Sequence, residues 1–182
     1  MRRLMCMGLL GILLTASAMA QDCPIGKGSM VLGGSAYIRN NSGDLYWSRT
    51  YGEVTPVLGL FISKGIFFGG EILFAYEKIK HFKDSYWYGL GPVFGYYFDL
   101  YPNKVDFKGA IYPYVKGKAV FKRTGQYTLK CAGGEFGMDL MLSNTVALDV
   151  GIRASYDFID KGSFGVVSGS DVGASLGIVA FL

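Results

Sequence analysis

Residues 171–182 read DVGASLGIVAFL, and their alternating pattern decides the predicted fold. Every second side chain is aliphatic, and the intervening side chains are mostly glycine, serine or aspartate. The aliphatic set is Val172, Ala174, Leu176, Ile178, Ala180 and Leu182. A strand with one apolar face and one face of small or polar residues is typical of a transmembrane β-barrel, whose outside contacts lipid and whose inside is tight and polar. These residues therefore predict a membrane-spanning strand.

Seven further segments alternate in the same way, so the sequence predicts eight strands. Their expected ranges are 28–39, 53–63, 66–78, 85–99, 107–121, 128–142, 145–158 and 170–182. Short connections at 64–65, 100–106 and 143–144 alternate with longer ones at 40–52, 79–84, 122–127 and 159–169. Short turns on the periplasmic side and longer outer loops are typical of membrane barrels. The pattern predicts an all-β, eight-stranded antiparallel up-and-down transmembrane β-barrel.

The first 20 residues have the features of a secretory signal peptide. Arg2 and Arg3 precede an apolar run at 7–14, and Ala18-Met19-Ala20 supplies small residues for cleavage. The apolar run is shorter than the roughly 20 residues that a membrane-spanning helix needs. We expect cleavage after Ala20, which leaves 21–182 as a single barrel domain.

Composition agrees with a barrel and argues against other classes. The chain is 51% hydrophobic and 18% charged, against about 25% charged in ordinary soluble domains. Beyond residue 20, the longest run without charge is 85–98, and glycine and proline interrupt it. Without a helical span, a closed sheet is the way for such a chain to satisfy its backbone in lipid. The formal charge of +4 falls to +2 when Arg2 and Arg3 are removed, too little to predict nucleic-acid binding.

A soluble lipocalin-type barrel is the competing fold, and the two faces of the strands argue against it. Its exterior would need a dense polar coat. Here one face is large and apolar, and the other carries too few charges to solvate an exterior. The apolar face comprises Ile72, Phe74, Tyr76, Phe94, Tyr96, Phe98, Phe136, Met138, Leu140, Leu142, Leu148, Val150, Ile152 and Tyr156.

The glycine-rich aromatic strand YGLGPVFGYYF at 88–98 and the terminal Phe181-Leu182 resemble small outer-membrane barrels of the OmpA transmembrane-domain and OmpX type. The resemblance implies the outer membrane of a Gram-negative bacterium, where lipid and lipopolysaccharide are the surrounding partners. It also implies that the barrel-assembly machinery recognises the C-terminal strand. We expect a monomer that needs no cofactor.

Ionisable side chains on the inward face are the first candidates for function. They are Glu71, Lys116, Lys118, Glu135, Asp139, Asp149 and Arg153. Lys116, Glu135 and Arg153 fall near the middle of three consecutive strands, so we expect them to pair laterally. Glycines at similar depth, Gly33, Gly59, Gly91 and Gly177, are expected to leave the volume that long side chains fill. An eight-stranded interior is narrow. We therefore favour a plugged, charge-compensated interior over an ion path.

Aromatic residues gather near the predicted strand ends, where girdles anchor a barrel at the two interfaces. The outer set is Tyr86, Trp87, Tyr88, Phe121, Tyr127 and Phe158, and the inner set is Phe61, Phe67, Phe68, Tyr96, Phe98, Tyr101 and Phe107. The same residues could line a ligand groove, but their placement at both ends favours anchoring.

Basic residues in the predicted second and third loops are candidates for contact with lipopolysaccharide phosphates. Lys80, Lys83, Lys122 and Arg123 form this set, and Lys78, His81 and Lys130 accompany it. An ordinary solvated loop is the alternative. A loop adhesin is a second alternative, based on the aromatic and basic cluster Tyr46, Trp47, Arg49 and Tyr51 in the long first loop.

Enzymatic activity is not expected. Barrels that modify lipid A as acyltransferases or deacylases use a histidine base, and His81 is the one histidine of the chain. Asp84 and Ser85 follow it closely and complete the sole possible grouping, but a loop lacks the rigid scaffold that catalytic geometry needs. The alternative interpretation is a lipid A-modifying enzyme.

Cys23 and Cys131 are predicted at opposite ends of the barrel, too far apart for a disulfide.

Overall fold

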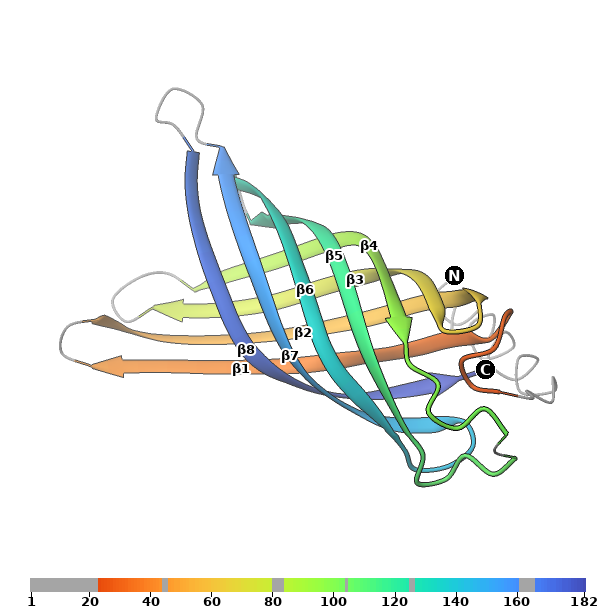
Figure 1. Cartoon of the computed structure of the whole chain (residues 1–182). Helices are drawn as coiled ribbons and strands as arrows, with labels where there is room; N and C mark the ends of the chain where they lie inside the picture. Colours follow the sequence, from red (N-terminus) through yellow and green to blue (C-terminus); the bar gives the residue numbers. More distant parts are fainter. Residues whose placement is uncertain (1–22, 44–45, 80–83, 104, 125–126, 161–165) are drawn as a thin grey trace, which may run out of the picture.

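The computed structural model describes residues 23–43, 46–79, 84–103, 105–124, 127–160 and 166–182. Eight strands form a closed antiparallel barrel in which each strand pairs with the next and β8 returns to β1 (Figure 1). The strands are β1 Met30–Gly43, β2 Tyr46–Ser63, β3 Ile66–Ile79, β4 Ser85–Tyr97, β5 Ile111–Thr124, β6 Tyr127–Met141, β7 Val146–Asp160 and β8 Val166–Phe181. The predicted all-β, eight-stranded fold is confirmed.

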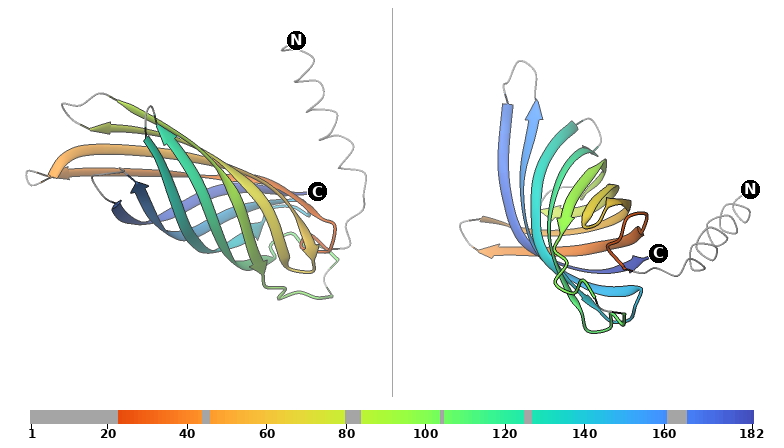
Figure 2. Two further views of the ribbon diagram at one scale, coloured as in Figure 1. Left: turned by 90° about the horizontal axis from the view of Figure 1, so that it is seen from above. Right: turned by 45° about the vertical axis from the view of Figure 1, so that its right-hand side comes forward.

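The barrel has two different ends. The C-terminus and the start of β1 meet at one end, where the Met30 amide donates to the Leu182 carbonyl at 2.7 Å. We call this the closed end and the opposite one the open end. Both views of Figure 2 show the strands tilting around a common axis between these ends. No helix in the described ranges is long and apolar enough to cross a membrane.

The strands reach further at the open end than the sequence predicts. The expected loop 40–52 is mostly strand, because β1 and β2 stay paired from Ile38↔Gly52 to Gly43↔Tyr46. The residues in this stretch are mostly polar, so their side chains show no apolar–polar alternation. Their backbones nevertheless pair as in the rest of the two strands. The longest connection between strands, 98–110, lies instead at the closed end. The predicted distribution of long loops is therefore wrong.

Side chains alternate between lipid-facing and interior positions, as the sequence predicts. Phe94, Phe136 and Ile152 are 64%, 61% and 62% exposed, whereas Asp139 and Arg153 on the same strands are 0% and 6% exposed. Apolar exposure on this scale at the surface of a closed barrel fits contact with lipid. The predicted assignment of faces is confirmed.

An aromatic cluster fills the closed end of the lumen. Phe61, Phe67, Tyr97 and Phe181 are at most 1% exposed, and the Phe61 ring centroid lies 5.2 Å from that of Tyr97 and 6.4 Å from that of Phe181. Ile25, just before β1, packs into the same cluster. We call these five residues the aromatic floor.

Part of the predicted aromatic girdle is therefore wrong. Phe61, Phe67 and Phe107 are buried inside the closed end, and Trp87 is turned toward the lumen at the open end. Their sequence neighbours of opposite parity, such as Phe68, remain exposed to lipid. Successive side chains of a strand point to opposite faces. The depth of an aromatic residue along the strand therefore does not decide whether it faces lipid or the lumen.

The seam between β1 and β8 is short. The two strands pair only from Val31↔Phe181 to Ala36↔Leu176, and they diverge toward the open end (Figure 1). The Tyr37 ring lies against the backbone of Gly173 beyond this pairing, so close that a Cβ there would approach the ring to 2.2 Å. Glycine at 173 is thus what allows Tyr37 to pack against β8.

Replacing Phe136 by arginine should destabilise the barrel by about 2–4 kcal/mol and slow its insertion, because a charge near the midplane of the lipid-facing surface must be desolvated. Urea unfolding in phospholipid vesicles measures this, with Phe136→Leu as a control of similar polarity to the wild type. A Phe136→Arg variant as stable as wild type would show that this face does not contact lipid.

Candidate functional site

Ion pairs cross the middle of the lumen and join strands that are not neighbours. Lys118 of β5 lies 3.0 Å from Glu71 of β3, and Arg153 of β7 lies 2.7 Å from Glu53 of β2. All four side chains are at least nine-tenths buried. Breaking one partner of a buried pair is costly, since it leaves the other charge uncompensated. These two pairs therefore tie together strands that are not neighbours in the sheet.

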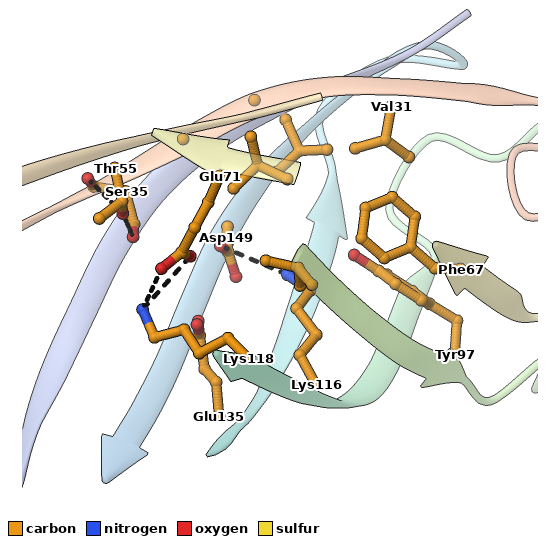
Figure 3. Close-up of a pocket in the computed structure, with 15 residues that line it drawn as sticks. Val31, Ser35, Thr55, Phe67, Glu71, Tyr97, Lys116, Lys118, Glu135 and Asp149 are labelled. Atoms are coloured by element: carbon orange, nitrogen blue, oxygen red, sulfur yellow. Dashed lines mark hydrogen bonds and ion pairs between the residues drawn. The ribbon is translucent and has the colours of Figure 1, made fainter. Parts of the chain in front are cut away.

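A small cavity of about 30 Å³ lies between these pairs and the aromatic floor. Figure 3 shows Lys118 directed at Glu71 and Lys116 directed at Asp149, with Lys116 Nζ 4.0 Å from the Asp149 carboxylate. Ser35 and Thr55 hydroxyls, 2.9 Å apart, line another wall. The cavity has room for water-sized occupants only.

Arg153 does not pair with Glu135, and this expectation is wrong. The backbone register places Arg153 opposite Glu135, but the guanidinium crosses the lumen to Glu53 and packs 4.2 Å from the Tyr37 ring centroid. Glu135 instead accepts hydrogen bonds from Tyr114 (2.7 Å) and Ser175 (3.1 Å). The long arginine side chain reaches a strand that lateral register does not indicate.

Two residues of this interior were missed by the sequence analysis. Glu53 begins the predicted second strand, whereas β2 starts at Tyr46 and places Glu53 well inside the barrel. Tyr114 alternates with lipid-facing residues of β5, and its hydroxyl reaches both Glu135 and Asp149. The parity of the strand predicts Tyr114 inside, but the expected polar interior comprises charged side chains only.

The expected role of the four interior glycines also needs correction. A Cβ at Gly59 would come within 2.5 Å of the Phe67 ring, so this glycine makes room for the aromatic floor. A Cβ at Gly33, Gly91 or Gly177 would meet the backbone of a neighbouring strand. These three glycines allow the strands to pack closely. The atoms nearest to the four glycines do not belong to Lys116, Glu135 or Arg153, so the expectation that they leave space for those side chains is wrong.

A second cavity, about 310 Å³, occupies the open end. Its walls carry Trp87, whose indole donates to Glu77 at 3.2 Å, and the ion pair between Lys122 and Asp157 at 3.2 Å. We call this cavity the vestibule. The Glu53–Arg153 pair lies among its lining residues, so the ion pairs separate the vestibule from the cavity below.

Lys122 therefore does not belong to the predicted lipopolysaccharide contacts. Its neighbours Phe121 and Arg123 are exposed on the outside, so Lys122 between them faces the lumen and is 8% exposed. The prediction treated 122–127 as a loop, in which alternation would not apply, but β5 continues to Thr124. Lys80 and Lys83 lie outside the described residues.

Exposed basic residues do lie on the outer surface near the open end. Lys130 of β6 is flanked in register by Phe121 of β5 and Phe158 of β7, both exposed. Arg123 of β5 is flanked by Tyr88 of β4, also exposed. Cations and aromatic rings thus alternate around the rim, as at a membrane–water interface.

The candidate catalytic residues and the proposed adhesin cluster lie only partly within the described residues. His81 lies outside the described residues, Asp84 accepts a hydrogen bond from Tyr76 at 2.8 Å, and Ser85 begins β4. In the proposed adhesin cluster, the backbone of 46–51 belongs to β2 and is not a loop, and Tyr51 donates to Glu53 inside the barrel. No group of three potential metal ligands occurs among the described residues.

Replacing Arg153 by methionine should cost about 3–5 kcal/mol, because Glu53 is left as an uncompensated buried charge. Adding Glu53→Gln should recover much of this loss, whereas adding Glu135→Gln should not. Unfolding free energies of the three variants in detergent or vesicles test this. If Glu135→Gln recovered the lost stability instead, Arg153 would be paired with Glu135 on the adjacent strand, which would contradict its contact with Glu53.

Comparisons with known proteins bear on the fold. No protein-family model matches the chain, and no match is found among curated proteins. Neisserial surface protein A has a solved structure of similar fold, with 22% identity over 85% of this chain and 97% of that one and a TM-score of 0.56. The solved structure of the outer membrane protein OprG from Pseudomonas aeruginosa is also similar in fold. Its sequence is 12% identical over 88% of this chain and 99% of that one, and the TM-score is 0.54. The chain has the fold of the small eight-stranded outer-membrane β-barrels.

Proposed function

We propose that this chain is a non-enzymatic outer-membrane protein that closes its own lumen and contacts lipopolysaccharide at its outer rim. The observation that carries the proposal is the pairing of a filled lumen with an apolar, lipid-facing surface bordered by basic and aromatic residues. In this orientation the closed end faces the periplasm and the open end faces outward. Its role is then structural or one of surface interaction, and it conducts no ions.

The filled closed end supports the absence of conduction. A conducting path would have to pass the aromatic floor and the two buried ion pairs Glu71–Lys118 and Glu53–Arg153. Moving those charges aside would leave them unpaired in a poorly solvated interior, which costs several kcal/mol. An eight-stranded barrel also has an interior that side chains can fill completely.

The row of cations around the rim supports contact with lipopolysaccharide. Arg123 and Lys130 point away from the barrel at the level of exposed aromatic rings, where phosphate groups of an outer leaflet would lie. Clustered Lys and Arg near an anionic lipid surface contribute about 1 kcal/mol each. Lys78 is also exposed, near the open end of β3, and adds to this positive surface.

The non-enzymatic assignment draws support from what surrounds the candidate catalytic groups. Asp84 is engaged by Tyr76 on the outer surface, so that carboxylate has a structural partner. A serine nucleophile needs a positioned base that is itself oriented by a third group. Mass spectrometry of lipid A from cells with and without the overexpressed protein would reveal an acyl-chain change if this assignment were wrong.

In planar bilayers, the refolded protein should give no large, stable unitary conductance, because the floor and ion pairs occlude the lumen. Replacing Phe61, Phe67 and Tyr97 together by alanine should produce measurable conductance by opening the closed end. Stable conductance of the wild-type protein, unchanged in the triple variant, would contradict the occluded lumen.

The double variant Arg123→Ala, Lys130→Ala should bind vesicles that contain lipopolysaccharide about 30-fold more weakly, since two cations at about 1 kcal/mol each are lost. Its binding should also depend less on salt concentration. Cosedimentation with vesicles at several salt concentrations measures both effects.

A matched control removes the same charge from the opposite end of the barrel. Lys27→Ala, Lys108→Ala alters two exposed lysines near the closed end and should leave binding at the wild-type level. Equal binding by the rim variant and wild type would remove the proposed contact. Equal weakening by both double variants would show a response to net charge alone.

A further inference from the structure

Asp139 is a fully buried carboxyl group that belongs to no ion pair among the described residues. It lies on the inner face of β6, two residues before Met141 of the apolar cluster at the closed end, and is 0% exposed. Neither carboxylate oxygen has a hydrogen-bond partner within the described ranges, and the ion pairs found there do not include it. A buried polar group without partners needs a physical explanation.

The register places a second carboxyl group directly opposite. Asp139 of β6 pairs with Asp149 of β7 on one side and with Tyr112 of β5 on the other. Side chains directly opposite on antiparallel strands have Cβ atoms roughly 4.5–5.5 Å apart, and like charges at that spacing are destabilising. Two ionised carboxylates are therefore unfavourable at this position.

The charges nearby do not balance these two carboxylates. The ionisable groups that face this part of the lumen are Tyr97 of β4, Tyr112, Tyr114 and Lys116 of β5, Glu135 of β6 and Asp149 of β7. Lys116 is the cation among them, and its ammonium lies 4.0 Å from Asp149 and 3.6 Å from the Tyr114 ring centroid. Glu135 and Asp149 already present two negative charges to this lysine.

Within the described ranges, the remaining walls bring no further cation to Asp139. The members of the closed-end cluster from β1, β2, β3 and β8 are apolar, namely Val31, Phe61, Phe67, Val179 and Phe181, with Val57 of β2 packed against them. Glu71 of β3 and Lys118 of β5 line the small cavity above, but they are paired with each other. Asp149 lines that cavity and Asp139 does not.

We propose that the Asp139–Asp149 pair is a proton-binding site that holds one proton at neutral pH, with Asp139 as the neutral member. A neutral carboxylic acid removes the repulsion with Asp149 and avoids an uncompensated charge beside the aromatic floor. Loss of the proton to solvent at alkaline pH puts a second negative charge there. Deprotonation therefore loosens the closed end.

Infrared difference spectroscopy of the refolded wild-type protein, with carbon-13 in its aspartates, tests the proposal directly. A protonated-carboxyl band that shifts with the label should be present at neutral pH. It should disappear in Asp139→Asn and persist in Asp106→Asn, which makes the same change at an exposed position in the 98–110 connection. Absence of the band in wild type overturns the proposal, and its persistence in Asp139→Asn overturns the assignment to Asp139.

The dependence of folding stability on pH provides a second test. Stability changes with pH in opposite directions for a protonated and for an ionised Asp139. If the native state binds one proton more than the unfolded state, stability falls as pH rises. The folding equilibrium constant of wild type relative to Asp139→Asn should then fall tenfold per pH unit above about pH 5, until the pair deprotonates. An ionised, stabilised Asp139 would make this ratio rise through the acid range and stay flat near neutrality.

A bound monovalent cation is the competing occupant. It predicts no protonated-carboxyl band and a wild-type stability that rises with sodium chloride relative to Asp139→Asn, and that combination overturns the proposal. If Asp139→Asn does not refold, the labelled wild-type spectrum still tests the proposal, since absence of a protonated aspartate band overturns it.

Discussion

The constraint on which this structure depends is the need to satisfy every backbone N–H and C=O group without help from water. A lipid-facing strand can do so only by pairing with strands on both sides, and a sheet removes its last unpaired edges only by closing. The pairing of β1 with β8 completes the closure here, although it spans only Val31 to Ala36 on β1. Gly173 lets Tyr37 pack across the seam beyond that pairing.

Closure then creates a narrow interior that the chain fills in two different ways. Near the closed end the filling is aromatic, and Gly59 provides room for the Phe67 ring. Further along the axis the filling is ionic, with Glu71–Lys118 and Glu53–Arg153 connecting strands across the lumen. Asp139 lies at the boundary between these layers, where burial is complete and charge compensation is poor. The same burial that closes the lumen makes the protonation of this group important.

Much of the architecture could be predicted because it depends on one strand at a time. Alternation in 171–182 and in the other strands identified the fold, and parity placed Phe136 outside and Asp139 inside, as the structure has them. The prediction for Lys122 is wrong because β5 continues to Thr124, and the period of two in this strand turns Lys122 inward. Polar strand ends carry a weak pattern, so their boundaries and the lengths of the outer connections were predicted poorly.

By itself the sequence determined which face of the barrel each strand residue occupies, because side-chain direction is a local property of an extended chain. Tertiary structure alone decided which interior residues meet. Arg153 lies opposite Glu135 along the sheet but bonds to Glu53, a hundred residues away, because strand tilt and the register around the closed barrel bring β2 across the lumen from β7. No pattern within a single strand encodes that distance across the lumen.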